Sequence, residues 1–460
     1  MGHLEYLPSS PLLMDEPATD KMASQRSESS HVLQEALQTA IEKYVAKNPK
    51  SKALHEEAIE IFPGGNTRTV LHTDPFPLCM KSGKGYQVFS EDGDTYTDLT
   101  AEFTAGLYGH SNPEILSALR NVLDNIGLSV GATTAQEQLF AKEICQRFGL
   151  ERIRLTNSGT EANLHAIAAA KLFTGKSKVV AFGASYHGAV LGFKEDQPAP
   201  NNVDQDSWIV AKYNDLDGAV GAIQGNDVAA VILEGMQGSG GCIAGTPEFL
   251  KGVQEAARKA GVIFILDEVM TSRITSKGIA GLRGLNPDMK TFGKYLGGGV
   301  AFGAFGGRAD IMGVYDPRAK GSVAHSGTFN NNTLVTHAGY AGISRVYTPS
   351  VADALTATGN QLLARLNEVS SGTKLCFTGL GSVLNSHFDV NGARDIENVF
   401  EIDEVKELKD LFWYCLLENG FWSTRRGFLA LVLGTPQSEL DRFVEVVEAF
   451  LAKYKHLVQM

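Results

Sequence analysis

Several features that define other classes of protein are scarce or missing in this chain. Only five of its 460 residues are cysteine, at positions 79, 145, 242, 376 and 415, and none forms a CxxC pair. This spacing favours neither a disulfide framework nor a zinc site, so we expect no bound metal and a reducing, cytoplasmic setting. No apolar run approaches the roughly 20 residues of a membrane span, and the first residues lack a signal-peptide pattern. Membrane insertion and secretion are therefore not expected.

Positive charge is also in short supply. The chain has 41 lysines and arginines against 52 acidic residues, a formal net charge of -11. A nucleic-acid partner is not expected, because binding to a phosphate backbone requires a basic surface. A small anionic ligand is compatible with this charge, since a few local donors can hold it. The chain does contain 43% hydrophobic and 20% charged residues, which is typical of a globular protein large enough for two domains.

The first hundred residues contain a polar stretch, helical patterns and turns. Residues 1–30 are rich in Ser, Pro and charge without a sustained period, which predicts a mobile tail. A helical pattern covers residues 30–53 and a second covers 54–61, which ends at a strong break, PGG at 63–65. Residues 86–99 flank an acidic, glycine-containing turn and predict a β-hairpin.

The middle of the chain alternates short apolar strands with helices. Strands that are apolar along their whole length are typical of a parallel sheet covered on both faces. After about residue 340 helices dominate, with a strand at 427–433 and an amphipathic helix at 438–454. The predicted strands of the sheet are 153–158, 178–182, 228–233 and 262–266, and the clearest helices between them are 160–173 and 247–260.

This order of elements predicts an α/β fold with two domains. The large domain, residues 96–340, contains a mostly parallel central sheet flanked by helices and is expected to bind the ligand. Residues 341–460 form a smaller α+β domain, and the N-terminal segment 31–95 joins it.

The motif NSGTEA at 157–162 stands where a predicted strand ends and a helix begins. The N-terminus of a helix exposes unpaired N–H groups and the positive end of the helix dipole, so it suits a phosphate. Ser158 and Thr160 add hydroxyl donors, and Gly159 lets the backbone come close. The same residues also fit an ordinary helix N-cap, and they lack the glycine spacing of nucleotide-binding loops.

A second signal is the pair of acids that follows the apolar strand 262–266, Asp267 and Glu268. Ligands of open α/β sheets bind at the carboxyl ends of the strands. A carboxylate buried there requires a cationic or hydrogen-bonding partner, because burying it alone is costly. The alternative is a structural carboxylate that accepts hydrogen bonds from backbone amides.

A third signal is a lysine between glycines, in FGKYLGGG at 292–299. Most such lysines lie in solvated turns. In a drier, electropositive site, however, Lys294 can lose its proton near neutral pH and form an imine, and the glycines leave room for a bulky attached group. Each of the three signals is weak alone, but together and in this order they are strong.

With these motifs the sequence resembles the class III (subgroup II) pyridoxal-phosphate aminotransferases of fold type I, over roughly residues 50–450. SYHG at 185–188 and HSGT at 325–328 belong to the same resemblance. Within the family the chain is similar to the glutamate-1-semialdehyde aminomutase branch. It is closer still to β-phenylalanine aminotransferases, through PGGNTRTVL (63–71) and EFTAGLYGH (102–110). The resemblance implies pyridoxal 5′-phosphate as the cofactor.

The resemblance also implies a role for each motif residue. Lys294 carries the cofactor as a Schiff base and, once freed, moves a proton on the substrate. Asp267 pairs with the pyridinium nitrogen and keeps it protonated, which makes the ring an electron sink. Thr328 reaches the phosphate of the neighbouring subunit, which implies a homodimer with shared active sites. The other implied cofactor-binding residues are Ser158, Gly159 and Thr160 at the phosphate, Tyr186 stacked on the ring with His187 beside it, and Glu234 near the site.

Recognition of a substrate carboxylate requires a cation, and the planar fork of arginine suits it. By the resemblance, Arg68 matches a carboxylate-binding arginine. Arg426 matches a second, movable arginine that serves dicarboxylic acceptors. Arg425 is adjacent, so the register between these two neighbours is open.

The resemblance implies a transaminase that moves an amino group from an amino acid, with β-amino acids among the candidates, to an oxo-acid such as 2-oxoglutarate or pyruvate. Three alternatives stay open: a glutamate-1-semialdehyde-type 2,1-aminomutase, a racemase or epimerase, and a cofactor-stabilised binding protein without activity. The joint presence of Lys294, Asp267, Tyr186 and Thr328 argues against the last of these. The sequence does not identify the donor or the acceptor, nor does it decide between a dimer and a tetramer.

Overall fold

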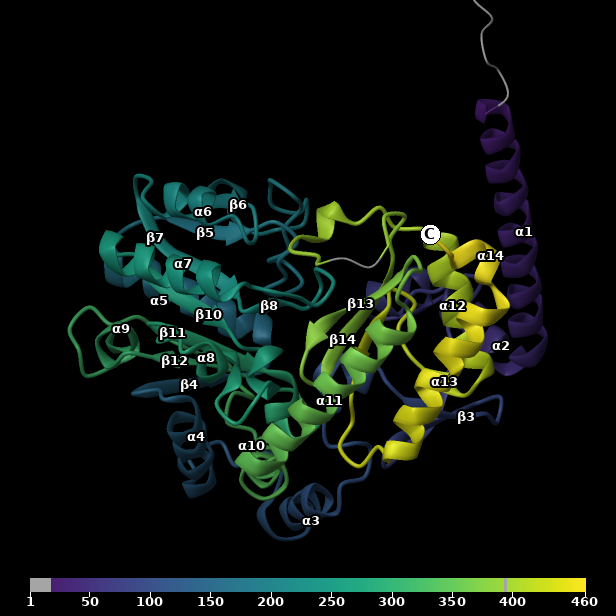
Figure 1. Cartoon of the computed structure of the whole chain (residues 1–460). Coiled ribbons are helices and arrows are strands. Elements are labelled where there is room, and N and C mark those ends of the chain that lie inside the picture. The colour runs from purple at the N-terminus through teal and green to yellow at the C-terminus, as the bar shows by residue number, and fades with distance from the viewer. Residues whose placement is uncertain (1–17, 393–394) are drawn as a thin grey trace, which may run out of the picture.

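A computed structural model describes residues 18–392 and 395–460, and a sheet of seven strands forms the middle layer of the part drawn on the left in Figure 1. The strand order is β4-β12-β11-β10-β7-β5-β6. β12 runs antiparallel to β4 and β11, and the other neighbouring pairs are parallel. The predicted mostly parallel sheet is therefore confirmed. The strands are β4 Arg152–Thr156, β5 Lys178–Phe182, β6 Trp208–Ala211, β7 Val228–Glu234, β10 Ile263–Asp267, β11 Met289–Gly293 and β12 Gly303–Gly307.

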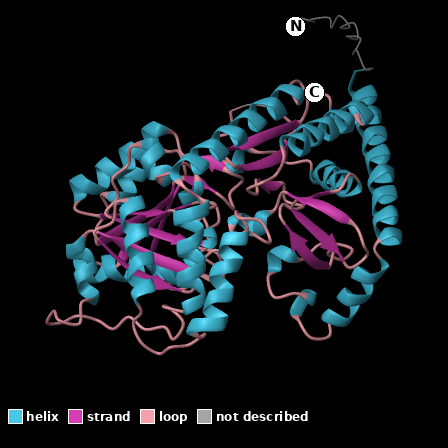
Figure 2. Cartoon of the chain, turned by 90° about the horizontal axis from the view of Figure 1, so that it is seen from below, coloured by secondary structure: helices cyan, strands magenta, loops and turns pink. Residues whose placement is uncertain are grey.

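Helices cover both faces of this sheet, as Figure 2 shows. Every residue of β7 and of β10 is buried, so the apolar runs of the sequence meet covering helices on both sides. β6, β11 and β12 were not predicted. β12 reads GAFGG, and glycine has a low propensity for strands. The helices of this part are α4 Ala135–Phe148, α5 Gly159–Thr174, α6 Leu216–Ile223, α7 Pro247–Ala260, α8 Gly278–Arg283, α9 Ala309–Met312 and α10 Thr333–Ala341.

The N-terminal helices differ from the prediction in two ways. α1 spans Ala18–Lys47, so residues 18–30 are helical, and the prediction of a tail was wrong for that stretch. Residues 1–17 of the predicted tail lie outside the described residues. The predicted helix 30–53 is also interrupted at Asn48 (φ -120, ψ 54), and α2 begins anew at Pro49 and ends at Ala58. A residue before proline is disfavoured in the helical conformation, which explains the break.

The predicted hairpin is confirmed as β2 (Gln87–Ser90) and β3 (Thr95–Asp98). β1 (Met80–Lys84) extends it on one side. On the other side β15 (Phe421–Trp422) pairs in parallel with β3, so a segment near the C-terminus completes a sheet that begins near the N-terminus.

The C-terminal part packs helices on a three-stranded sheet, β13-β14-β16. α1 contributes Val32, Leu33 and Leu37 to the same apolar core. The strand predicted at 427–433 is shorter, because pairing with β14 stops at Ala430. The amphipathic helix predicted at 438–454 is confirmed. The elements are α11 Pro349–Val369, β13 Leu375–Leu380, β14 Val383–Phe388, α12 Lys406–Glu418, β16 Phe428–Ala430, α13 Gln437–Lys453 and α14 Lys455–Val458; α3 Pro113–Asn121, β8 Met236–Gln237 and β9 Ile243–Ala244 complete the set.

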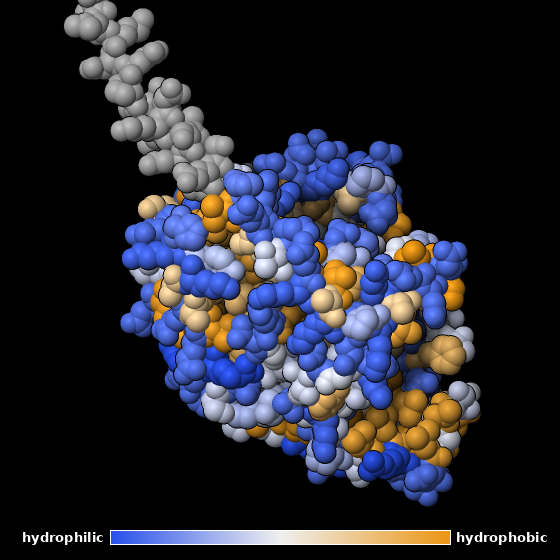
Figure 3. All heavy atoms as spheres, turned by 90° about the vertical axis from the view of Figure 1, so that its right-hand side faces the viewer, coloured by the Kyte–Doolittle hydropathy of each residue, from blue (hydrophilic) through white to orange (hydrophobic). Residues whose placement is uncertain are grey.

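The surface on the side of α1 and α2 is mostly hydrophilic, with apolar side chains scattered over it and gathered near one lower corner (Figure 3). Within the described ranges, no helix combines the length and the apolar character that crossing a bilayer requires.

Candidate active site

Lys294 directly follows β11, in a left-handed backbone conformation (φ 54). Its Nζ donates a hydrogen bond to the carbonyl oxygen of Phe103, at 2.8 Å. Burial lowers the pKa of Lys294 to about 8, and the charge of Arg426 adds to this effect, while Asp267 and Glu234 oppose it. About a tenth of the amine is thus neutral at pH 7, and this neutral form is the one that can attack a carbonyl.

The two acids at the end of β10 have different environments. Asp267 is 4% exposed and faces the loop that contains His187, whose Nδ1 lies 2.8 Å from Asp267 Oδ2. Glu268 points the other way and accepts hydrogen bonds from Thr271 Oγ1 and from the backbone N–H groups of Ile279 and Ala280. Glu268 is therefore the structural carboxylate, and Asp267 is the acid available to the site.

Asp267 still has acceptor capacity. Oδ2 also accepts from Asn163 Nδ2 at 2.8 Å, and Oδ1 accepts from the backbone N–H of Val269 at 2.9 Å. A carboxylate offers about four lone-pair positions, so three donors leave room for one more, such as a protonated ring nitrogen. Sequence reasoning missed Asn163. Asn163 is 1% exposed in the structure. The sequence feature that could have indicated it is an amide side chain among the mostly small and apolar residues of α5.

Glu234 ends β7 and lies beside Asp267 in the parallel register. Its carboxylate accepts hydrogen bonds from the backbone N–H groups of Tyr186 (2.9 Å) and Gly238 (3.0 Å). The pKa of Glu234 is raised to about 7, chiefly by burial and also by the charge of Asp267, while His187 acts in the opposite direction. Glu234 thus fixes the backbone of Tyr186, whose ring is about half exposed.

The predicted phosphate motif forms the start of α5. Ser158 Oγ accepts a hydrogen bond from the backbone N–H of Glu161 at 3.1 Å, so the helix-capping alternative is present in the structure. Gly159 is packed tightly, because a Cβ at this position would lie 2.8 Å from Val269 Cγ1. A Cβ on Gly293 would lie 3.4 Å from the backbone nitrogen of Gly159. The close packing at these glycines brings the start of α5 against the residue that precedes Lys294.

Thr160 connects this motif to the SYHG segment. A Cβ on Gly188 would lie 2.4 Å from Thr160 Oγ1, so only glycine fits there. The structure therefore brings a helix N-terminus, a partly neutral lysine and a buried acid to one edge of the sheet. These residues fit a cofactor that carries a phosphate, a carbonyl that condenses with an amine, and a ring nitrogen.

Arg68 and Glu102 form an ion pair at the mouth of the site. Arg68 Nη1 lies 2.6 Å from Glu102 Oε1, and the guanidinium carbon lies 5.8 Å from the centre of the Phe103 ring. Sequence reasoning assigned no role to Glu102 or Phe103, although both lie in the EFTAGLYGH motif. Phe103 joins the two halves of the site, since its carbonyl oxygen contacts Lys294 and its ring contacts Arg68.

The two neighbouring arginines both line one large cavity, but they differ in their contacts. Arg425 is held by Asp410 through two hydrogen bonds of 2.6 Å each, and it also donates to the carbonyl oxygen of Asp74. Arg426 instead lies over the rings of Phe103 (5.4 Å) and Phe428 (5.6 Å) and donates to Ser239 Oγ at 3.2 Å. Arg425 is therefore paired with a carboxylate, whereas Arg426 contacts a hydroxyl group and two aromatic rings, and the role predicted for Arg426 stays a prediction.

Arg68 and Arg426 line the same cavity, of about 1060 Å³. Its walls come from both ends of the chain, and much of the lining is apolar. Leu54, Val70, Leu71, Met80, Trp413 and Trp422 belong to it.

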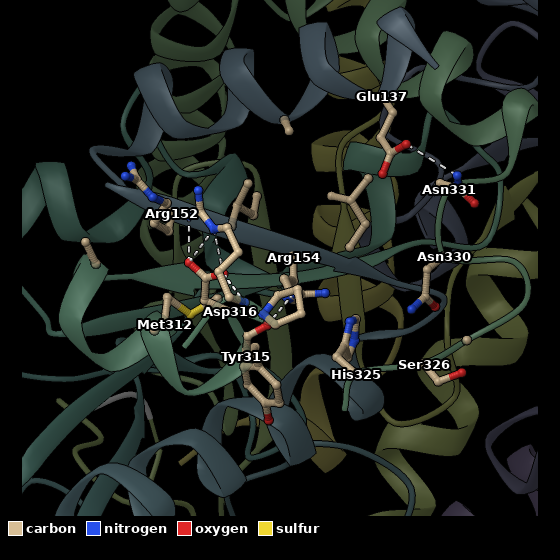
Figure 4. Close-up of a pocket in the computed structure, with 18 residues that line it drawn as sticks. Glu137, Arg152, Arg154, Met312, Tyr315, Asp316, His325, Ser326, Asn330 and Asn331 are labelled. Carbon is tan, nitrogen blue, oxygen red and sulfur yellow. Dashed lines mark hydrogen bonds and ion pairs between the residues drawn. The ribbon is translucent and has the colours of Figure 1, made fainter. Parts of the chain in front are cut away.

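Thr328 lies on an exposed loop next to Phe329, which is 58% exposed. The loop contacts the phosphate motif through Asn330, whose Oδ1 accepts a hydrogen bond from Asn157 Nδ2 at 2.9 Å. Its residues His325, Ser326 and Asn330 line a second cavity, of about 610 Å³, shown in Figure 4. The contact predicted for Thr328 is with a neighbouring subunit, and it stays a prediction.

The fold and this set of residues define the chain as a pyridoxal-phosphate-dependent enzyme of fold type I. Its family follows from comparisons with known proteins. A family profile described as Aminotransferase class-III matches residues 70–376. The chain belongs to the class-III aminotransferases, and it is a transaminase that uses pyridoxal 5′-phosphate with a small-molecule amino donor and an oxo-acid acceptor.

Three relatives illustrate the similarity. An uncharacterized aminotransferase of Schizosaccharomyces pombe is 46% identical over 91% of this chain and 95% of that protein. The β-phenylalanine transaminase of Variovorax paradoxus is 42% identical over 93% of this chain and 98% of that protein. The crystal structure of the Variovorax enzyme superposes with a TM-score of 0.90 over 93% of this chain and 99% of that chain. A glutamate-1-semialdehyde 2,1-aminomutase of Caldicellulosiruptor saccharolyticus is more distant, at 32% identity over 87% of this chain and 97% of that protein, which favours the transaminase over the aminomutase.

Proposed function

We propose that this transaminase takes the amino group of a β-amino acid with an apolar or aryl side chain and transfers it to 2-oxoglutarate or pyruvate. The observation that carries this proposal is the position of Arg68 in the wall of a large cavity with many apolar side chains. A carboxylate bound at Arg68 leaves the apolar part of the donor to fill the remaining space. The Variovorax relative, at 42% identity, is named for a donor of this kind.

We assign the cofactor contacts as follows. Pyridoxal 5′-phosphate, when bound, supplies an aromatic ring that withdraws electrons from the substrate carbon. Lys294 Nζ would hold the cofactor covalently, and its amine would be the base that moves the proton of that carbon. Asp267, held by His187 and Asn163, would accept a hydrogen bond from the protonated ring nitrogen, and its negative charge would keep that nitrogen protonated. The remaining assignments are Ser158, Gly159 and Thr160 at the phosphate, Tyr186 against the ring, and Glu234 as the residue that positions Tyr186.

We assign Arg426 to the second carboxylate of a dicarboxylic acceptor. The guanidinium lies over two aromatic rings, and no carboxylate pairs with it within the described part of the chain. An acceptor carboxylate can therefore bind it without first breaking an ion pair.

A donor screen tests the substrate proposal. The purified enzyme is incubated with α-, β- and ω-amino compounds, each with 2-oxoglutarate and with pyruvate, and product amines are quantified. We expect β-amino acids with aryl or alkyl side chains to be the best donors. A clear preference for α-amino acids, or for amines without a carboxylate, would contradict the proposal. Product formation from an amino-aldehyde without any added oxo-acid would instead support the aminomutase.

We also propose that the enzyme is a homodimer in which Thr328 contributes to the phosphate site of the partner. Large apolar side chains are exposed in this region: Phe329, next to Thr328 in the chain, is 58% exposed, and Leu128 and Val130, in the segment that Thr333 contacts, are each 50% exposed. Thr333 Oγ1 hydrogen-bonds to the carbonyl oxygens of Gly127 and Leu128, so these exposed segments are adjacent. Burying such a patch against a second copy is favourable.

Complementation tests the shared site. Lys294→Ala inactivates the site of the protomer that carries it. Thr328→Ala impairs only the site of the partner protomer. A mixed dimer of the two contains one site with both native residues, so mixing inactive or weakly active variants should restore activity. Failure of mixed dimers to gain activity, with dimers verified by light scattering, would refute the shared site.

The domain limits stay part of this proposal: segment 31–95 and residues 341–460 form the small domain, and residues 96–340 the large one. The core shared by α1 with α11 and α13, and the pairing of β15 with β3, support this division.

A further inference from the structure

One short turn contacts all the cationic side chains assigned to the site. The four residues Ala101–Thr104 have φ values of 46, 47, 53 and 78, and none of them is glycine. Left-handed backbone is disfavoured for residues with a side chain, and a run of it requires support from its surroundings. The carbonyl oxygen of Phe103 accepts from Lys294, its ring lies under Arg68 and Arg426, and Glu102 pairs with Arg68.

The pair between Glu102 and Arg68 has the properties of a temporary contact. The two side chains are 54% and 45% exposed, so water competes for both charges. A single hydrogen bond, from Arg68 Nη1 to Glu102 Oε1, joins them. Exposed pairs of this kind contribute little to stability, whereas a free carboxylate can bind arginine through two parallel hydrogen bonds.

We propose that Glu102 is a built-in competitor for the ligand carboxylate at Arg68. This inference rests on the proposed function, in which Arg68 binds the donor carboxylate. A donor then exchanges one carboxylate for another at the same guanidinium. When no donor is bound, Glu102 neutralises Arg68 and keeps small anions off it.

The exchange makes Glu102 a specificity-determining residue. Because the donor gains little from replacing one carboxylate with another, a carboxylate alone is not sufficient for tight binding. The rest of the affinity must come from the part of the ligand that fills the apolar cavity beside Arg68. Simple anions such as acetate should therefore bind poorly, and 3-arylpropanoates should bind well.

The test uses 3-phenylpropanoate, which has no amino group and cannot react, and its neutral amide as a matched probe. Trp413 and Trp422 line the cavity, so tryptophan fluorescence reports binding to the cofactor-loaded enzyme, and calorimetry gives a second measure. In Glu102→Gln the carboxylate probe should bind roughly two- to fivefold more tightly, the scale of an exposed ion pair, and acetate should gain by a similar factor. Binding of the amide should not change.

Three further variants complete the design. Arg68→Ala should remove the difference between the carboxylate and the amide, with or without Glu102→Gln. Glu102→Asp shortens the side chain and keeps its charge, so the affinity of this variant for 3-phenylpropanoate should lie between those of the native enzyme and Glu102→Gln. Glu448→Gln removes the same charge from an exposed position of α13 and should leave both affinities as they are. Circular dichroism and thermal unfolding verify that each variant is folded.

Weaker or unchanged binding of the carboxylate probe to folded Glu102→Gln would overturn the inference, because Glu102 would then orient Arg68 or play no part. The outcome is separable from that of the proposed function. If β-amino acids do not react but Glu102→Gln still binds the carboxylate probe more tightly, the role of Glu102 is supported and the proposed donor class is wrong. If β-amino acids react but Glu102→Gln does not bind the carboxylate probe more tightly, the donor class is supported and the role proposed for Glu102 is wrong.

Discussion

Glu234 and Asp267 end neighbouring parallel strands and lie opposite each other in the register, so two buried carboxylates stand side by side at one edge of the sheet. Asp267 is supplied with side-chain donors by His187 and Asn163, while Glu234 has two backbone N–H groups. Burial raises the pKa of Glu234 to about 7, so Glu234 takes up a proton near neutral pH.

The first prediction is a pH-dependent stability that originates at Glu234. Its pKa is 4.5 in an unfolded chain and about 7 in the folded protein. Between these values the folded state binds more protons than the unfolded state, so the free energy of unfolding falls as pH rises, by up to about 1.4 kcal/mol per pH unit. Glu234→Gln, which does not titrate, should flatten this slope. Urea unfolding of both proteins at several pH values from 4.5 to 8 measures it.

Glu448→Gln serves as the matched control, since it removes an exposed carboxylate and should leave the slope unchanged. Any hydrogen bond that glutamine fails to make shifts the Glu234→Gln curve by a constant amount, which does not depend on pH. Parallel curves for the native and Glu234→Gln proteins would show that Glu234 stays ionised.

The second prediction concerns the lysine that attaches the cofactor. Because burial and Arg426 lower the pKa of Lys294 to about 8, the rate at which the cofactor-free protein takes up pyridoxal 5′-phosphate should rise with pH with a midpoint near 8. Stopped-flow absorbance follows the attachment. Borohydride reduction and mass spectrometry should then place the label on Lys294. Lys290 is an internal comparison, because it is also buried and donates to a backbone carbonyl, that of Phe148, yet should carry no label.

The sequence predicted those parts of the site that lie directly at the ends of regular elements. Asp267 follows a buried strand and Ser158 caps a helix, so local patterns determine both positions. Glu102 and Phe103 could not be placed in this way, since four successive non-glycine residues in left-handed conformation contradict local propensity and are maintained only by contacts distant in sequence. Asn163 was missed for a related reason, because its partner Asp267 lies 104 positions further along the chain.

The fold, like the site, was predicted only where local sequence patterns determine the structure. Apolar runs located β4, β5, β7 and β10, whereas glycine-rich β12 depends on pairing with β4 and β11 for its conformation. The sequence also gave no sign that α1 starts as early as Ala18, because its first residues lack an amphipathic period.

The third prediction is a loss of catalysis without loss of the cofactor in Asp267→Asn. The amide keeps the size of the side chain but removes the charge that holds the proton on the ring nitrogen. Removal of one preorganised electrostatic partner typically costs about 100-fold or more in kcat. We expect kcat to fall by this order, while the protein still binds pyridoxal 5′-phosphate through Lys294, as visible absorbance would report. A variant with near-native kcat would exclude Asp267 from the assigned role.

The last prediction separates the two neighbouring arginines. Arg426→Ala should raise the KM for 2-oxoglutarate by roughly 10- to 100-fold, the value of a charged hydrogen bond, and should change the KM for pyruvate little, because pyruvate has no second carboxylate. Arg425→Ala should instead affect stability. It breaks the two hydrogen bonds to Asp410 and should lower the free energy of unfolding by about 1.5–3 kcal/mol, while both KM values stay unchanged. Steady-state kinetics with each acceptor, together with urea unfolding, distinguish the two residues. If Arg425→Ala instead selectively impairs 2-oxoglutarate, the acceptor carboxylate binds one position earlier than the contacts of Arg426 indicate.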